Sequence, residues 1–237
     1  ENPFGLDPIY SFALGDLNDD GFVDVYASYH PIMGTTELND KLWMNITNNN
    51  NYFALSLRGN TSNRSGIGAT VKLYGEWGMQ TRVIQSGTGY GVTNSLTARF
   101  GLDQAQTIDS LVVMWPSGEI DKHINPEVNT HYLLYESSCF KPVAQITASA
   151  DIIDCINPDI ELSVENVDYN TIEWEWDKFS DTITLSSTFH QFAILDKDGP
   201  CPNVTENVFI HSNYVRKRQS NVINKPIQCI SQSFQFS

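Results

Sequence analysis

The sequence predicts an all-β protein with a β-hairpin near its N-terminal end and two β-sandwich or barrel domains after it. Short segments of alternating apolar and polar residues recur about 8–12 residues apart with turn residues between them, which is typical of sandwiches and barrels. No window shows the sustained i, i+3, i+4 apolar pattern of an amphipathic helix. The cysteines fall only between residues 139 and 229, which indicates a separate C-terminal domain.

The predicted hairpin carries an acidic loop at residues 16–24, with Gly21 allowing a sharp turn in its middle. Because Ca²⁺ binds about six to eight oxygen ligands, we predict that it is bound by Asp16, Asn18, Asp20, Asp24 and the backbone carbonyl of Phe22. The start of the loop matches the EF-hand pattern, but its twelfth position is Ala27 instead of glutamate, and its flanks are typical of strands. The alternative interpretation is an Asx-rich turn without a metal ion.

Predicted strands follow one another through the middle of the chain. They lie at residues 52–57, 69–74, 81–85, 96–102, 110–115 and 131–135. The segment Ser110–Trp115 is almost wholly apolar, so we expect a strand that is covered on both faces. Turns are predicted at Gly75–Gly78 and Pro116–Gly118.

Five segments of this region carry a family resemblance: Ser62–Val71, Gln80–Arg82, Gly87–Tyr90, Arg99–Leu102 and Ile108–Gly118. In order and spacing they resemble the ASPIC/UnbV domain, which follows FG-GAP repeats in cartilage acidic protein and its bacterial relatives. The loop at residues 15–24 resembles the calcium loop of an FG-GAP repeat. The resemblance implies an FG-GAP-like calcium-binding segment at residues 1–42 and an ASPIC/UnbV-like β-domain at 43–136, and it supplies no catalytic residues. The family's usual Ser-Gln after Gly-Tyr is replaced here by Val92-Thr93.

Residues 137–237 are predicted to form an immunoglobulin-like β-sandwich. The segment Ile172–Asp177 alternates, which places Trp174 and Trp176 on one face of a strand. Tryptophans between two cysteines resemble the core of immunoglobulin-like domains and of the PKD/Ig-like modules in surface proteins of Bacteroidota. We therefore predict two disulfides, Cys155–Cys201 across the sheets and Cys139–Cys229 between the first and last strands.

Charge, cysteine content and sequons together bear on where the protein is located. The formal net charge is −14, from 28 acidic and 14 basic residues, which disfavours nucleic acid and anionic membranes as partners. No apolar run is long enough to span a membrane. An even number of cysteines without a CxxC pair indicates disulfides. Four N-x-[ST] sequons, at Asn45, Asn60, Asn63 and Asn203, are predicted glycosylation sites. Together these features predict a secreted, extracellular or cell-surface protein.

Three functions are open at this point. The first is a non-catalytic, calcium-stabilised structural or adhesive protein whose partners are other copies of itself or other extracellular proteins. The alternating segment Ser231–Ser237 is a candidate donated strand that could link copies into a filament. The second is a carbohydrate- or protein-binding module of a larger surface protein. The third is a glycoside hydrolase with paired carboxylates, although the sequence contains neither an HExxH nor a GxSxG motif.

Overall fold

The computed structural model is all-β, as predicted, and contains no helix among the residues that it describes. Within those residues, accordingly, nothing has the length and apolarity of a membrane-spanning helix. The described residues are 9–18, 20–29, 39–46, 48–149, 152–153, 159–165, 172–174, 178–179, 182–185, 190–195, 201, 204–209 and 211–212.

The chain divides into two compact units, Glu1–Val143 and Ala144–Ser237. The sequence predicted a boundary after residue 136, seven residues earlier than the division in the structure. The difference arises because β11 (Cys139–Pro142) pairs antiparallel with β10 (Thr130–Tyr135) and so belongs to the first unit. Each unit is described separately below.

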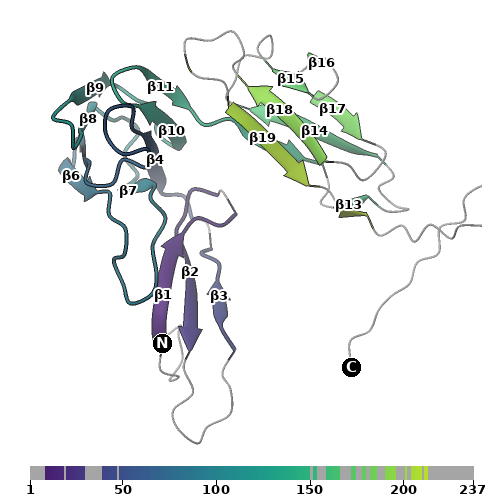
Figure 1. Cartoon of the computed structure of the whole chain (residues 1–237), viewed down its shortest axis with the longest axis horizontal. Helices are drawn as coiled ribbons and strands as arrows, with labels where there is room; N and C mark the ends of the chain where they lie inside the picture. Colours follow the sequence, from purple (N-terminus) through teal and green to yellow (C-terminus); the bar gives the residue numbers. More distant parts are fainter. Residues whose placement is uncertain are drawn as a thin grey trace, which may run out of the picture. The chain divides into compact units, whose positions relative to one another are not determined.

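A small antiparallel sheet lies at the start of the first unit (Figure 1). Its order is β1-β2-β3, with β1 at Ile9–Gly15, β2 at Asp24–Tyr29 and β3 at Lys41–Trp43. The acidic loop connects β1 to β2, so the prediction that strands flank this loop is confirmed.

Two four-stranded sheets form the rest of the first unit. The first has the order β11-β10-β4-β7 and the second the order β6-β5-β8-β9. The parallel pair β4 and β10 is the exception among otherwise antiparallel neighbours in these two sheets. The bounds are β4 Asn51–Arg58, β5 Thr70–Gly75, β6 Gly78–Val83, β7 Ala98–Asp103, β8 Ser110–Met114 and β9 Ile120–Ile124.

The core of the first unit lies between these two sheets. Alternate residues of each strand point inward, because successive side chains of a strand lie on opposite faces. Phe53 and Phe100 come from the first sheet, and Leu73 and Leu111 from the second, and all four are buried in one cluster. The two sheets therefore form a β-sandwich.

The outer face of the second sheet is open, which corrects one expectation. Strand β8 was expected to be covered on both faces because it is apolar throughout. Leu111 and Val113 are buried, but Val112 is only half-buried and Met114 is exposed. A run of apolar residues does not reveal whether a second layer covers the sheet, and here no described element does so.

The second unit contains two antiparallel sheets, in the three-plus-four arrangement of an immunoglobulin-like sandwich. Their orders are β12-β14-β17 and β16-β15-β18-β19, and a short parallel pair joins β13 and β20. The strand predicted at Ile172–Asp177 is observed as β15 at Glu173–Trp174, and Trp176 lies outside the described residues. The bounds of the others are β12 Gln145–Ala148, β13 Ile152–Ile153, β14 Ile160–Glu165, β16 Lys178–Phe179, β17 Thr182–Leu185, β18 His190–Leu195, β19 Val204–Phe209 and β20 His211–Ser212.

Candidate functional site

The predicted metal loop is shaped by Gly21, which has φ +89°. A Cβ at this position would lie 2.2 Å from the ring of Tyr52 on β4. Only glycine adopts this backbone conformation without strain and also leaves room for the ring. The turn is therefore pressed against the first sheet of the sandwich, where Phe22 also lies beside Tyr52 with ring centroids 6.2 Å apart.

Asp24 ties the loop to the segment after β3. It is fully buried, and its two carboxylate oxygens accept hydrogen bonds from backbone amides: Oδ2 from Leu17 and Oδ1 from Asn45, both at 2.8 Å. A buried carboxylate is tolerated when such donors replace its water. Asp24 therefore joins the loop to the segment after β3 whether or not a metal ion is bound.

Asp16 forms the main charged contact of the loop. Its oxygens accept hydrogen bonds from the backbone amides of Asp20 and Gly21, at 3.1 and 2.9 Å. The guanidinium of Arg99, on β7, lies 2.9 Å from Asp16 Oδ2, and the Asp16 side chain is only 2% exposed. Sequence reasoning missed Arg99, because no local pattern connects it with a loop so far away along the chain.

The remaining predicted ligands lie within the loop itself. Asn18 Nδ2 donates to Asp20 Oδ2 at 2.9 Å, and the backbone amide of Phe22 donates to Asp20 Oδ1 at 2.8 Å. Among the described residues, no group of three or more Asp, Glu, His or Cys side chains is gathered as metal ligands. The donor types suit Ca²⁺, since all are hard oxygens, and the calcium site stays a prediction.

Glu136 is a second buried carboxylate that the sequence did not single out. It follows β10 and reaches the loop after β4, where Oε2 accepts hydrogen bonds from the backbone amides of Asn60, Thr61 and Ser62 at 2.7–2.8 Å. Oε1 accepts hydrogen bonds from the hydroxyls of Ser62 and Ser117. One side chain therefore holds together three loops of the first unit.

The pKa of Glu136 reflects these donors. Burial alone would raise the pKa of this carboxyl group, but the hydrogen bonds from the two serine hydroxyls and the backbone amides outweigh it and lower the pKa to about 2. Glu136 is therefore ionised at every physiological pH. Its role is to order the loop, since its exposed fraction is only 2%.

Three of the four predicted glycosylation sites can be placed. Asn45, Asn60 and Asn63 are exposed, and the side-chain amides of all three donate hydrogen bonds to backbone carbonyls, of Val23, Glu136 and Ile67 respectively. Glycosylation leaves one N–H on each amide, so these bonds and a glycan are compatible. Asn203 lies outside the described residues.

Cys139 and Cys201 are each part of a disulfide, and no described cysteine is free. Cys155 and Cys229 lie outside the described residues. The pairings Cys155–Cys201 and Cys139–Cys229 therefore stay predictions.

A serine–histidine contact lies on the outer side of the first sheet of the sandwich. Ser56 Oγ is 2.9 Å from His131 Nε2. Burial and the nearby positive charge of Arg99 lower the pKa of His131 to about 4. A catalytic base needs a pKa near the working pH and a carboxylate that supports it, whereas this histidine lies beside an arginine. The contact therefore gives no support to the hydrolase hypothesis.

Comparison with known families identifies one part of the chain. Residues 59–139 match the family model for ASPIC and UnbV. The resemblance inferred from five sequence segments is thus confirmed for this part, which contains Arg99 and Glu136. The FG-GAP and PKD/Ig-like resemblances are not shown by any comparison.

The other comparisons add little. A solved structure titled "Structures of Clostridium thermocellum CbhA fibronectin(III)-like modules" shares 9% sequence identity with this chain, with a TM-score of 0.20, and the match covers 90% of this chain and 100% of the other. A TM-score this low says nothing about fold or function. No curated protein matches the sequence.

Proposed function

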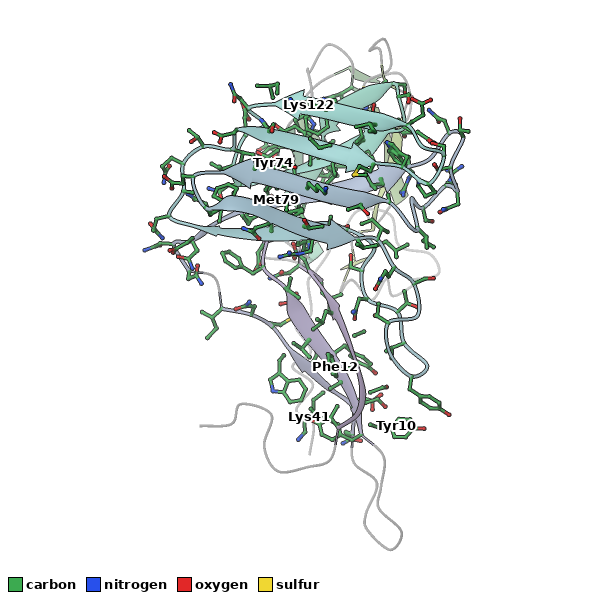
Figure 2. All side chains as sticks on the ribbon, turned by 90° about the vertical axis from the view of Figure 1, so that its left-hand side faces the viewer. Tyr10, Phe12, Lys41, Tyr74, Met79 and Lys122 are labelled. Atoms are coloured by element: carbon green, nitrogen blue, oxygen red, sulfur yellow. The ribbon has the colours of Figure 1, made fainter. Side chains whose placement is uncertain are left out.

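We propose that this chain is a non-catalytic structural or adhesive module of an extracellular protein and that calcium stabilises it. We also propose that it associates with other copies of itself. The observation that carries the proposal is the open outer face of the sheet β6-β5-β8-β9, which Figure 2 shows facing the viewer. Secretion is supported by the disulfide-bonded state of Cys139 and Cys201 and by the exposed sequons.

The outer face is apolar at its two ends and basic in its centre. Strand register places three rows of side chains on it: Met79, Tyr74, Ser110 and Ile124; Thr81, Lys72, Val112 and Lys122; Val83, Thr70, Met114 and Ile120. Met79, Ile120 and Ile124 are more than half exposed. Exposed apolar side chains that are clustered on one sheet face favour contact with another protein surface.

Charge favours a second copy of this chain as the partner. The outer face holds Lys72 and Lys122 and no acidic residue, whereas the chain as a whole carries a net charge of −14. The rest of the surface of another copy is therefore acidic and complementary to this face. A contact between two different surfaces of identical chains is heterologous, so copies would add head to tail into a row or a ring.

The area of the outer face determines how strongly two copies are expected to associate through it. Strands about 4.8 Å apart with a rise of about 3.3 Å per residue give the outer face roughly 300 Å². A standard interface buries about 800 Å² per partner, so we expect weak, salt-sensitive association.

Sedimentation velocity over a range of protein concentrations tests the proposal. The wild-type chain should form larger species as its concentration rises, and less so in high salt. The double variant Lys122→Glu, Ile124→Glu should stay monomeric, while Ile46→Glu should behave as wild type, because Ile46 is exposed away from the outer face. Self-association that is unchanged in the double variant, or absent from the wild type, would refute this use of the face.

Calcium binding at the loop is the second part of the proposal, and charge supports it. Asp16, Asp20 and Asp24 carry three negative charges, and Arg99 supplies one positive charge, so −3 + 1 leaves −2 in this loop. A divalent ion would neutralise that charge. Without the glutamate of an EF-hand, we expect a dissociation constant of about 10⁻⁴–10⁻³ M.

Thermal unfolding with calcium or with EDTA tests the calcium site. Calcium should raise the melting temperature of the wild type and have no effect on Asp20→Ala, which removes one predicted ligand. Asp109→Asn is the matched control, because Asp109 is exposed and its backbone hydrogen bonds to Tyr74 and Asn125 are kept in the variant. A melting temperature that is the same in calcium and EDTA would contradict a structural calcium ion in this loop.

Strand donation by Ser231–Ser237 is a second route of assembly. These residues lie outside the described residues, and the proposal is supported by their alternating sequence. A chain that lacks residues 231–237 should fold and form smaller assemblies than the full chain if the segment is donated to a neighbour. Unfolding of the truncated chain would instead assign the segment to its own domain.

A further inference from the structure

The segment 84–97 follows β6 and runs beside β1 (Figure 1). Residues of β1 and of this segment together line a groove. It consists of two adjoining hollows of about 250 and 350 Å³, which share Thr88 and Asn94 in their linings. The larger hollow has the volume of an ordinary small-ligand site. Neither the calcium loop ligands Asp20 and Asp24 nor the open sheet face contributes to this larger hollow.

The shape of the groove is built into the backbone. Gly87 and Gly91 both have φ +68°, and Gly89 forms a β-bridge with Val92. Asn94 Nδ2 donates to Thr88 Oγ1 at 3.0 Å, which ties the two sides of this turn together. These features hold the turn in one conformation before any ligand arrives, so little ordering is needed on binding.

Contacts between β1 and the segment 84–97 mark both ends of the larger hollow. At one end, the backbone N–H of Leu14 on β1 donates to Asn94 Oδ1 at 3.0 Å, and Leu14 O accepts from Ser95 N at 2.8 Å. At the other end, the rings of Tyr10 and Tyr90 meet edge to face, with centroids 5.6 Å apart. These two contacts leave no room for an extended peptide strand to pair along β1. A compact ligand suits the space better.

The lining of the larger hollow combines aromatic rings with neutral polar groups. Tyr10, Phe12 and Tyr90 are all more than half exposed, and Tyr90 is exposed to 77%. Figure 2 shows Tyr10 and Phe12 on the small sheet. Ser11, Thr88 and Asn94 supply hydroxyl and amide groups, and no charged residue lines this hollow.

We propose that this groove binds a neutral oligosaccharide. A pyranose ring presents an apolar C–H face that stacks on aromatic rings and a rim of hydroxyls that exchange hydrogen bonds with neutral polar groups. The uncharged lining and the net charge of −14 both disfavour an anionic sugar. The smaller hollow lies beyond the Leu14–Asn94 contact and is lined by the charged residues Arg82 and Arg99, so the proposed neutral site is the larger hollow. This inference is independent of self-association through the outer face.

The test uses the full chain on an array of neutral and uronic-acid oligosaccharides, followed by titration of the strongest neutral binder. Tyr90→Ala and Phe12→Ala should each weaken binding about tenfold, the equivalent of losing one stacked ring. Tyr26→Ala is the matched control and should bind within about twofold of wild type. Tyr26 is an exposed tyrosine of the same small sheet, but it pairs with Ala13 and so lies on the face opposite to Phe12.

Both variants alter exposed side chains, so folding should be preserved, and circular dichroism checks this. Saccharide protons near the aromatic rings should also show saturation transfer from the protein, and this signal should be weaker in Tyr90→Ala. The proposal is overturned if no neutral saccharide binds, if only uronic-acid sugars bind, or if both groove variants bind as the wild type does.

Discussion

Replacing Glu136 should destabilise the first unit more than replacing any carboxylate on the surface. Its carboxylate accepts hydrogen bonds from three consecutive backbone amides and two serine hydroxyls while only 2% exposed. Glu136→Ala leaves the three backbone N–H groups without an acceptor, and each buried unsatisfied donor costs about 1–3 kcal/mol. We therefore expect a loss of about 3–9 kcal/mol, a large share of the roughly 5–15 kcal/mol that stabilises a domain.

Glu136→Gln should cost less. The amide oxygen of glutamine can still accept from the backbone amides, and the hydroxyls of Ser62 and Ser117 can rotate to accept from its NH₂ group. What is lost is the charge, which makes such hydrogen bonds roughly twice as strong. We expect a cost of about 1–3 kcal/mol, between Glu136→Ala and the control Glu119→Gln, whose side chain is exposed.

Urea unfolding followed by tryptophan fluorescence measures these differences, since Trp115 is buried in the first unit. The pH dependence gives an independent check. The folded pKa of Glu136 is about 2, below its ordinary value of 4.5, so its contribution is complete above pH 4.5 and is lost as pH falls towards 2. The stability difference between wild type and Glu136→Gln should therefore shrink over this window. A difference that is constant with pH, or a Gln variant as stable as wild type, would refute the reasoning.

Two further predictions follow from the structure and a third from the sequence. Gly21→Ala should destabilise by about 1–3 kcal/mol in thermal unfolding, because φ +89° strains the backbone and the new Cβ meets Tyr52; unchanged stability would contradict the described turn. His131 should stay neutral in an NMR titration down to about pH 5, since its folded pKa is about 4. The free energy of unfolding should fall between pH 6.5 and 4, because the unfolded chain takes up the proton first. A titration midpoint near pH 6.5 would contradict the burial of His131. Non-reducing peptide mapping should find the pairs Cys155–Cys201 and Cys139–Cys229, and a 139–155 link would rule them out.

Local pattern was enough to predict the strands and the class of fold. Tyr52–Leu57 alternates strongly, and it became the buried centre of β4, while Gly75–Gly78 marked the turn between β5 and β6. These features depend on the side-chain alternation of a strand and on the backbone freedom of glycine, both of which are properties of neighbouring residues. The ASPIC/UnbV resemblance was likewise readable, because it depends on motifs in order along the chain.

The contacts at the candidate sites could not be predicted in this way. Arg99 reaches Asp16, Glu136 reaches Asn60, and β1 lies beside Tyr90 only because the sheets bring together segments that are far apart in sequence. The same limit explains the open face of β8, where an apolar segment was expected to be covered. The sequence by itself was enough to predict where the strands of the first unit lie, where turns separate them and which loop carries the acidic residues. Only the tertiary structure decided which charges meet and which faces stay open, because those outcomes depend on pairing across the chain that no local pattern encodes.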